Sequence, residues 1–120
     1  MKIAVTAQGT DLTSQVDPRF GRAKTFLVID TETQDYTSHD NTQNLNAPQG
    51  AGIQAGRAVV DLGVEVVLTG NVGPKAFATL QAGGVKVCPG ASGTVQDALE
   101  QFKAGRFEEA RDANVPGHWS

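Results

Sequence analysis

The sequence predicts an α/β domain built on a mixed, five-stranded sheet. Three observations favour this class. Two apolar, β-branched runs lie near the N-terminus, and a third, more polar run follows the second after a connection of hairpin length. Beyond residue 50, segments with helical periodicity alternate with short apolar runs. A hairpin followed by alternating helices and strands is typical of a sheet that is antiparallel on one side and parallel on the other.

Composition and charge indicate one globular domain. Of the 120 residues, 39% are hydrophobic and 14 are glycine. A chain of this length buries roughly two thirds of its unfolded surface without needing disulfides or a structural metal. We assign residues 1–107 to the domain and residues 108–120 to a C-terminal tail.

The same numbers exclude several classes of function. A formal net charge of -3 provides no general basic surface for nucleic acid. The first residues do not form a signal peptide, and no apolar run is long enough to span a membrane. We therefore expect a cytoplasmic protein that binds neither nucleic acid nor a membrane.

Three strands are predicted in the N-terminal part of the chain. Residues 2–6 and 25–30 are β-branched and apolar, whereas residues 35–40 are polar. The short connection between the second and third strands makes them antiparallel neighbours. Because of its polarity, the third strand is expected at the edge of the sheet.

Two helix-then-strand units and a last helix are predicted after residue 50. They are helix 51–62 with strand 64–69, helix 74–82 with strand 85–88, and helix 94–104. Pro74 suits the first turn of the second helix, and Gly105 ends the third. Ser92 or Thr94 is the expected N-cap of the third helix.

The predicted order of the sheet is 3-2-1-4-5, with strand 2 antiparallel to strand 1. In such a sheet a crevice opens beyond the carboxyl ends of the parallel strands. Loops 7–22, 70–74 and 88–93 converge there.

The first of these loops gathers three cations around Phe20, and two of them are Arg19 and Arg22. In an otherwise acidic chain, this local reversal of charge favours an anion. The alternative is that both arginines are solvated or paired with Asp11 and Asp17, while Phe20 packs in the core.

Glycines lie at the start of the first helix, at Gly50 and Gly52. Free backbone N–H groups at a helix N-terminus attract negative charge, and glycine permits close approach. The spacing does not fit a dinucleotide fingerprint, and no apolar strand comes directly before it. The alternative is a flexible loop with small residues for helix packing.

A second glycine-rich turn follows the most apolar strand and contains Gly70, Asn71, Gly73 and Lys75. It is not a P-loop, since the spacing is too short and Ala76 has no hydroxyl for magnesium. Its amides and the lysine are predicted to face the crevice. The alternative is turn chemistry alone.

Soft and imidazole ligands are scarce. The sequence has one cysteine, Cys88, and two histidines, His39 and His118, so one chain cannot build a closed zinc site or a four-thiolate iron–sulfur site. Cys88 is either a soft ligand or a small buried hydrophobic residue. We see no catalytic carboxylate set or nucleophile pair, and therefore expect no enzymatic activity.

Five segments together resemble a known family. They are MKIAVT at 1–6, VDPRFGRA at 16–23, QGAG at 49–52, LTGNVGPKA at 68–76 and SGTV at 92–95. Their order and spacing are similar to those of the dinitrogenase iron-molybdenum cofactor binding family, which includes NifX and the C-terminal domain of NifB, over residues 1–107. This resemblance implies a ribonuclease-H-like α/β fold without nuclease activity, and a role in carrying metal–sulfur cofactors. The orange-protein subgroup, which the chain resembles most, implies a non-covalently held molybdenum–copper sulfide cluster.

One residue departs from the family pattern. Many members have His-Phe-Gly-Arg where this chain has Arg19-Phe20-Gly21-Arg22. A guanidinium cannot ligate a metal but donates well to anions. The chain is therefore expected to hold a preassembled anionic cluster by charge and amide hydrogen bonds. The expected binding residues are Arg19, Phe20, Gly21, Arg22, Gly50, Gly52, Gly70, Asn71, Gly73, Lys75, Ser92 and Gly93.

In this hypothesis Phe20 forms a dry wall beside the cluster, and no side chain coordinates the metal. Two alternatives remain open. The chain is a carrier of an iron–molybdenum or iron–sulfur cofactor, or it is an interaction module that signals to a partner such as an ATPase.

Overall fold

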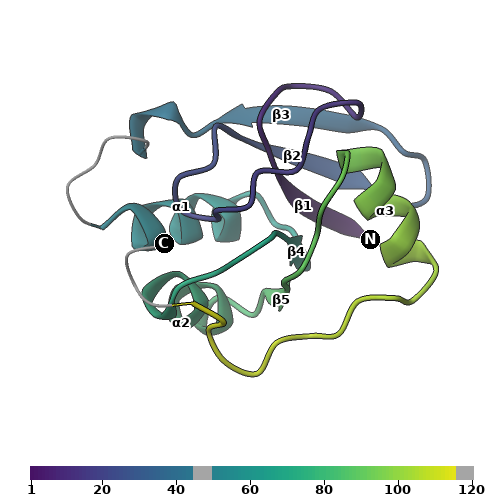
Figure 1. Cartoon of the computed structure of the whole chain (residues 1–120). Coiled ribbons are helices and arrows are strands. Elements are labelled where there is room, and N and C mark those ends of the chain that lie inside the picture. Colours follow the sequence, from purple (N-terminus) through teal and green to yellow (C-terminus); the bar gives the residue numbers. More distant parts are fainter. Residues whose placement is uncertain (45–49, 116–120) are drawn as a thin grey trace.

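The computed structural model describes residues 1–44 and 50–115. Five strands form one sheet in the predicted order, β3-β2-β1-β4-β5 (Figure 1). β1 pairs antiparallel with β2 and parallel with β4, β2 pairs antiparallel with β3, and β4 pairs parallel with β5. The strands are β1 (Lys2–Ala7), β2 (Thr25–Asp30), β3 (Tyr36–Asp40), β4 (Val66–Leu68) and β5 (Lys86–Cys88).

Helices cover both faces of the sheet. They are the short 3-10 helix η1 (Thr42–Asn44) and the α-helices α1 (Ala51–Asp61), α2 (Pro74–Ala82) and α3 (Val95–Lys103). α1 and α2 pack side by side on one face, and α3 lies on the other (Figure 1). The result is a three-layer arrangement of helices, sheet and helix.

The alternation of side chains along each strand divides the core in two. On the α1 and α2 face, Ala4, Val28 and Val67 belong to one buried cluster. On the α3 face, Ile3 and Leu68 belong to the other. Both faces of the central strands are therefore covered, which explains why their sequences are apolar throughout.

β4 is shorter than the predicted strand 64–69, but its ends continue the sheet's hydrogen bonding. The Glu65 amide donates to the Lys2 carbonyl at 2.9 Å, and the Glu65 carbonyl accepts from the Lys86 amide at 3.0 Å. At the other end, the Thr69 amide donates to the Cys88 carbonyl at 3.2 Å. The difference is one of element boundaries rather than of topology.

The described part of the C-terminal segment crosses the outer edge of β5. The Ala110 amide donates to the outward carbonyl of Val87 at 2.7 Å. Phe107 packs against the core on the α3 side, whereas Ala110 and Ala113 pack against the core on the other side. We call residues 107–115 the strap.

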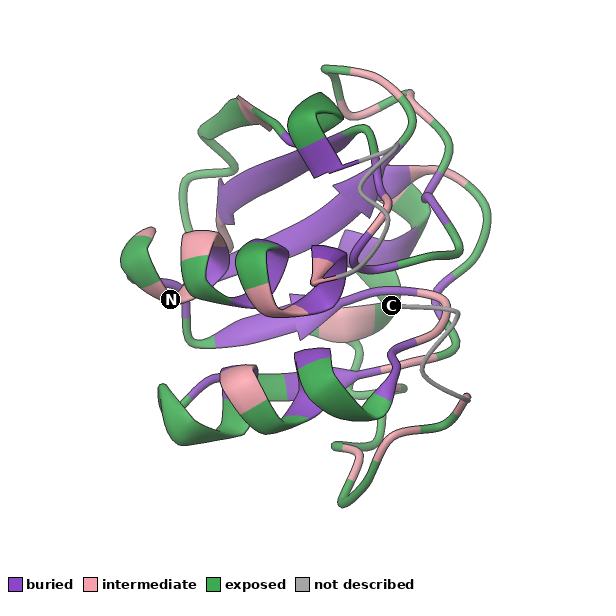
Figure 2. Ribbon diagram, turned by 90° about the vertical axis from the view of Figure 1, so that its left-hand side faces the viewer, coloured by how far each residue is buried: buried purple, intermediate pink, exposed green. Residues whose placement is uncertain are grey.

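The carboxyl ends of β1 and β4 and the N-termini of α1 and α2 lie at the same end of the molecule (Figure 2). This geometry follows from parallel strands joined by crossover helices. In the described ranges, no helix is long and apolar enough to cross a membrane.

Candidate functional site

Buried threonines at the ends of β1 and β4 anchor the first site loop. The Thr6 and Thr69 hydroxyls are 2.9 Å apart, and the Thr6 hydroxyl lies 2.8 Å from the Asp17 carbonyl. The Asp17 amide in turn donates to the Thr6 carbonyl at 2.9 Å. Since both threonines are fully buried, these bonds fix the path of the chain just before Arg19.

Arg19 stands on this fixed loop beside a buried carboxylate. The Arg19 amide donates to Asp17 Oδ1 at 3.1 Å, and Arg19 Nε lies 3.9 Å from the same oxygen. The Asp17 side chain is only 5% exposed, whereas the Arg19 side chain is 44% exposed. The pairing with Asp17 that the sequence left open is therefore present, but much of the guanidinium still faces solvent.

Phe20 lies in the core and not at the surface of the crevice. Its side chain is fully buried, and its ring centroid lies 5.5 Å from that of Phe26. The ring therefore does not form the dry wall beside the cluster that the sequence hypothesis gave it, and it packs in the core as the alternative expected. Its size and apolarity drive it under the loop, where it anchors the arginines on either side.

Two buried asparagines support Gly21 and Arg22. Asn41 Nδ2 donates to the Gly21 carbonyl at 3.1 Å and to the Ala23 carbonyl at 2.8 Å. Asn44 Nδ2 donates to Asn41 Oδ1 at 2.7 Å, and the Asn44 carbonyl accepts from Arg22 Nη1 at 3.4 Å. No sequence signal separated these asparagines from ordinary turn residues.

The second glycine-rich turn packs directly on the first loop. A Cβ added to Gly70 would lie 2.7 Å from Pro18 Cα, so only glycine permits this approach. Asn71 Nδ2 donates to the Pro18 carbonyl at 3.1 Å, and the Asn71 carbonyl accepts from the Phe20 amide at 3.2 Å. A short parallel bridge thus joins Arg19 to Asn71.

Helices α1 and α2 both begin at a glycine. Their N-caps are Gly50 and Gly73, and neither receives a side-chain cap from the residues that the structure describes. Gly50 has φ 81°, a conformation that glycine adopts readily. Lys75 is exposed in the first turn of α2, and Gly52 is buried in the first turn of α1. Residues 47–49 of the predicted glycine loop lie outside the described residues.

The N-terminus of α3 differs, because it is closed by its own side chains. Thr94, rather than Ser92, is the N-cap, and its hydroxyl accepts from the Asp97 amide at 3.0 Å. The Asp97 carboxylate accepts from the Thr94 amide at 3.0 Å. Ser92 and Gly93 are exposed beside this capping box, and the Gly93 carbonyl accepts from the Val16 amide at 2.9 Å.

Cys88 packs inside the core on the α3 side and is 5% exposed. Burial raises the pKa of its thiol, and the nearby Glu109 carboxylate adds to the increase. A thiol held in the neutral form is a poor soft-metal ligand. His39 pairs with the Thr37 hydroxyl at 2.9 Å on the edge strand β3, and His118 lies outside the described residues.

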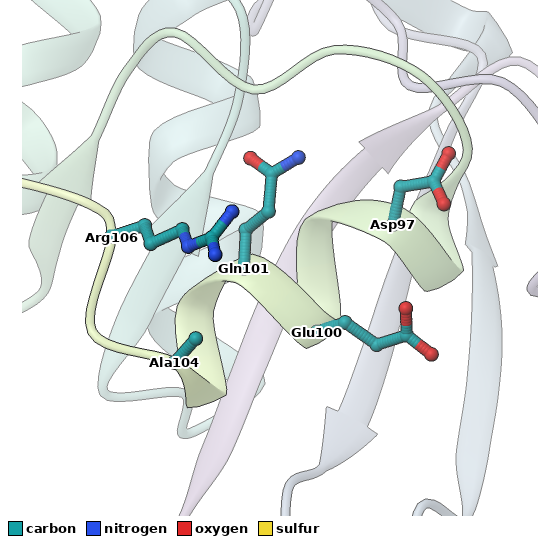
Figure 3. A pocket seen from close by; sticks show the side chains of 5 residues that line it. All are labelled: Asp97, Glu100, Gln101, Ala104 and Arg106. Atoms are coloured by element: carbon teal, nitrogen blue, oxygen red, sulfur yellow. The ribbon is translucent and has the colours of Figure 1, made fainter.

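Across residues 1–44 and 50–115, no three histidine, cysteine or carboxylate side chains gather in a group able to hold a metal ion. A hollow along α3 does not suit an anion. Its volume is about 340 Å³, and Figure 3 shows Asp97 and Glu100 with Arg106 in the following turn. Its carboxylates outnumber its single cation.

The loop after β1 thus carries Arg19 and Arg22, the first turn of α2 carries Lys75, and α1 and α2 begin at glycines that receive no side-chain cap from the residues that the structure describes. Both features attract negative charge. A family model, described as the dinitrogenase iron-molybdenum cofactor model, matches residues 1–105. The chain belongs to this family.

Solved structures agree with this assignment. The apo form of the orange protein from Desulfovibrio gigas is 44% identical to this chain in sequence. The two structures match with a TM-score of 0.92 over 95% of this chain and 96% of the orange protein. A protein from Thermotoga described as a candidate NifB protein is 42% identical, with a TM-score of 0.79 over 90% of this chain and 91% of that one. An uncharacterized protein of Methanocaldococcus jannaschii is 24% identical over 91% of each chain.

Proposed function

We propose that this chain carries an anionic molybdenum–copper sulfide cluster, held without covalent bonds at the end of the sheet beyond β1 and β4. The observation that carries the proposal is the placement of Arg19, Arg22 and Lys75 on elements that meet at this end, together with the uncapped N-termini of α1 and α2. The net charge of the chain is -3, so the attraction for an anion must be local.

Sulfide completes the metal coordination in such a cluster, so the protein needs no ligand set of its own. This fits the described residues, among which no ligand group is present and the one cysteine is a buried thiol of raised pKa. The protein supplies hydrogen bonds and compensating charge around the sulfides. Guanidinium groups suit this role because they donate several hydrogen bonds and remain charged.

Each predicted residue has a role in this proposal. Arg19, Arg22 and Lys75 compensate charge, and the backbone amides come from Gly50, Gly52, Gly70, Asn71, Gly73 and Gly93, with Ser92 and Gly21 at the rim. Phe20 does not contact the cluster in this proposal, because its buried ring anchors the loop that carries Arg19 and Arg22. In this proposal the cluster is cargo, and the chain catalyses no reaction on it. We also propose that the protein is cytoplasmic.

A titration tests the proposal. Wild-type protein is mixed with tetrathiomolybdate and copper, and binding is followed by the visible spectrum and by metal analysis after gel filtration. We expect the Arg19→Ala, Arg22→Ala double variant to bind about tenfold more weakly or worse, because it loses two charge-assisted contacts.

The matched control removes two exposed arginines far from the site, Arg57→Ala with Arg106→Ala, and should bind like the wild type. Unchanged affinity in the Arg19 and Arg22 double variant would contradict the charge-based account.

A second candidate is a carrier of an iron–molybdenum or iron–sulfur cofactor, which the description of the family favours. The same cationic end would hold either anion. Metal and sulfide analysis of protein purified from its native host separates the two. Molybdenum and copper together support the first candidate, whereas iron in stoichiometric amount supports the second.

A further inference from the structure

The strap ends on the turn that forms part of the proposed site. Three hydrogen bonds join Asn114 to this turn: its amide donates to the Val72 carbonyl at 3.2 Å, its Oδ1 accepts from the Val72 amide at 2.7 Å, and its Nδ2 donates to Asn71 Oδ1 at 3.2 Å. Asparagine is well suited to this task because its side chain both accepts and donates.

The contact at Val72 satisfies an amide that has little access to water. Val72 is fully buried in the core beneath α1 and α2. A buried N–H group without a partner is costly, so the side-chain oxygen Oδ1 of Asn114 holds the turn in its observed shape. The strap is itself held by the Ala110 bond to β5 and by the packing of Ala110 and Ala113.

The contact at Asn71 extends the effect to the arginine loop. Asn71 uses its side-chain nitrogen to bind the Pro18 carbonyl and its backbone carbonyl to bind the Phe20 amide. Asn114 occupies the remaining side-chain oxygen of Asn71 and so fixes which way the amide group points. A continuous set of hydrogen bonds therefore runs from the strap to the residues on either side of Arg19.

We propose that Asn114 is a positioning residue for the anion site, and that the strap holds the 70–73 turn and the Arg19 loop in their binding arrangement. The proposal rests on the proposed function for its ligand, but the hydrogen-bond set itself is independent of any cargo. The family model matches residues 1–105, so the strap lies outside the matched part of the chain.

The test compares Asn114→Ala with the wild type at 25 °C, where both are checked for folding by circular dichroism. In the unloaded protein, we expect the Val72 amide to exchange its hydrogen about tenfold faster or more, because its acceptor is lost. In the titration with tetrathiomolybdate and copper, we expect affinity to fall about tenfold. Glu108→Ala, an exposed side chain on the same strap, should change neither value.

A second variant, Asn114→Asp, separates the two side-chain contacts. It keeps an acceptor for the Val72 amide but places a carboxylate oxygen against Asn71 Oδ1. We expect exchange at Val72 as slow as in the wild type, because the acceptor remains, and faster exchange would contradict the assignment of Asn114 Oδ1 as that acceptor.

Two results overturn the proposal. One is unchanged Val72 exchange in Asn114→Ala, and the other is unchanged cluster affinity in a variant whose exchange is faster. If wild-type protein binds no cluster at all, the proposed function fails, whereas Val72 exchange in the unloaded protein still decides whether Asn114 holds the turn.

Discussion

At the scale of single residues, the buried Asp17 carboxylate determines how Arg19 is presented. Asp17 Oδ1 accepts a hydrogen bond from the Arg19 backbone amide, so the main contact of this carboxylate is with the backbone. The 3.9 Å separation from Arg19 Nε leaves only a weak ion pair at a half-exposed guanidinium. Arg19 is thus oriented by its neighbour, and in the proposed function its guanidinium donates hydrogen bonds to the anion.

Replacement of Gly70 should disturb this loop more than it disturbs the fold. In Gly70→Ala the added Cβ meets the Pro18 backbone at 2.7 and 2.8 Å, and overpacking of this kind costs about 1–3 kcal/mol. We expect that loss in urea unfolding together with weaker cluster binding. Gly105→Ala is the control, because its Cβ meets nothing within 4 Å and only its positive φ is strained. Full binding by Gly70→Ala would contradict the packing of the turn on Pro18.

The buried thiol of Cys88 should make stability depend on alkaline pH. Because burial raises the pKa of the folded thiol, the unfolded chain loses its proton first, at about pH 8.5. Stability is therefore full below this pH and falls as the pH rises toward the folded pKa. Denaturant unfolding at pH 7 and pH 10 should show a steeper decline for wild type than for Cys88→Ala. An equal decline of the free energy of unfolding in both proteins would mean that the fold does not raise the pKa of the Cys88 thiol.

At this scale the sequence points to charged candidates for the site but not to the residues that support its loops. Arg19, Arg22 and Lys75 were chosen from charge and loop position, whereas Asn41, Asn44 and Asn114 gave no signal. An asparagine in a turn looks the same whether it serves its own turn or a distant loop. The sequence left Phe20 either as a dry wall beside the cluster or as a core residue, and burial of its apolar area favours the core.

At the scale of elements, the three α-helices differ in how their N-termini are satisfied. α3 closes its first turn with Thr94 and Asp97, whereas α1 and α2 start at glycines that offer no side chain. Within the described ranges, the first turns of α1 and α2 therefore receive no side-chain cap, and in the proposed function their amides face the anion.

The capping box should stabilise α3 without affecting cargo. Thr94→Ala removes one acceptor for a helix amide and should lower the free energy of unfolding by about 1 kcal/mol. Cluster affinity should stay the same. The control, Ser92→Ala, should leave stability unchanged, since Ser92 does not cap the helix. A larger loss in Ser92→Ala than in Thr94→Ala would reverse the assignment of the cap.

Most elements could be predicted from the sequence because their signals are local. The helix at 74–82 was predicted with its observed bounds, from Pro74 at its start and the glycine pair after it. The strap was not predicted as an ordered part of the fold, because its polar sequence has few apolar residues with a regular period. Its path depends on the outward carbonyl of β5, which only the assembled sheet provides.

At the scale of the whole molecule, the proposed anion site depends on several weak electrostatic attractions at the end of the sheet beyond β1 and β4. Arg19 and Arg22 come from the loop after β1 and Lys75 from the first turn of α2 after β4, and the sheet order places β1 beside β4. In the proposed function, a chain with net negative charge holds an anion through the cations near this end of the sheet rather than through its overall charge. The central claim is that this arrangement suffices without a bond from any side chain to metal.

The most direct measurement uses a chain without cysteine or histidine, made by Cys88→Ala, His39→Gln and His118→Gln. It is titrated with tetrathiomolybdate and copper beside the wild type, with folding checked by circular dichroism. The account predicts the same metal stoichiometry, visible spectrum and affinity in both proteins. Loss of the bound cluster from the folded triple variant would contradict it.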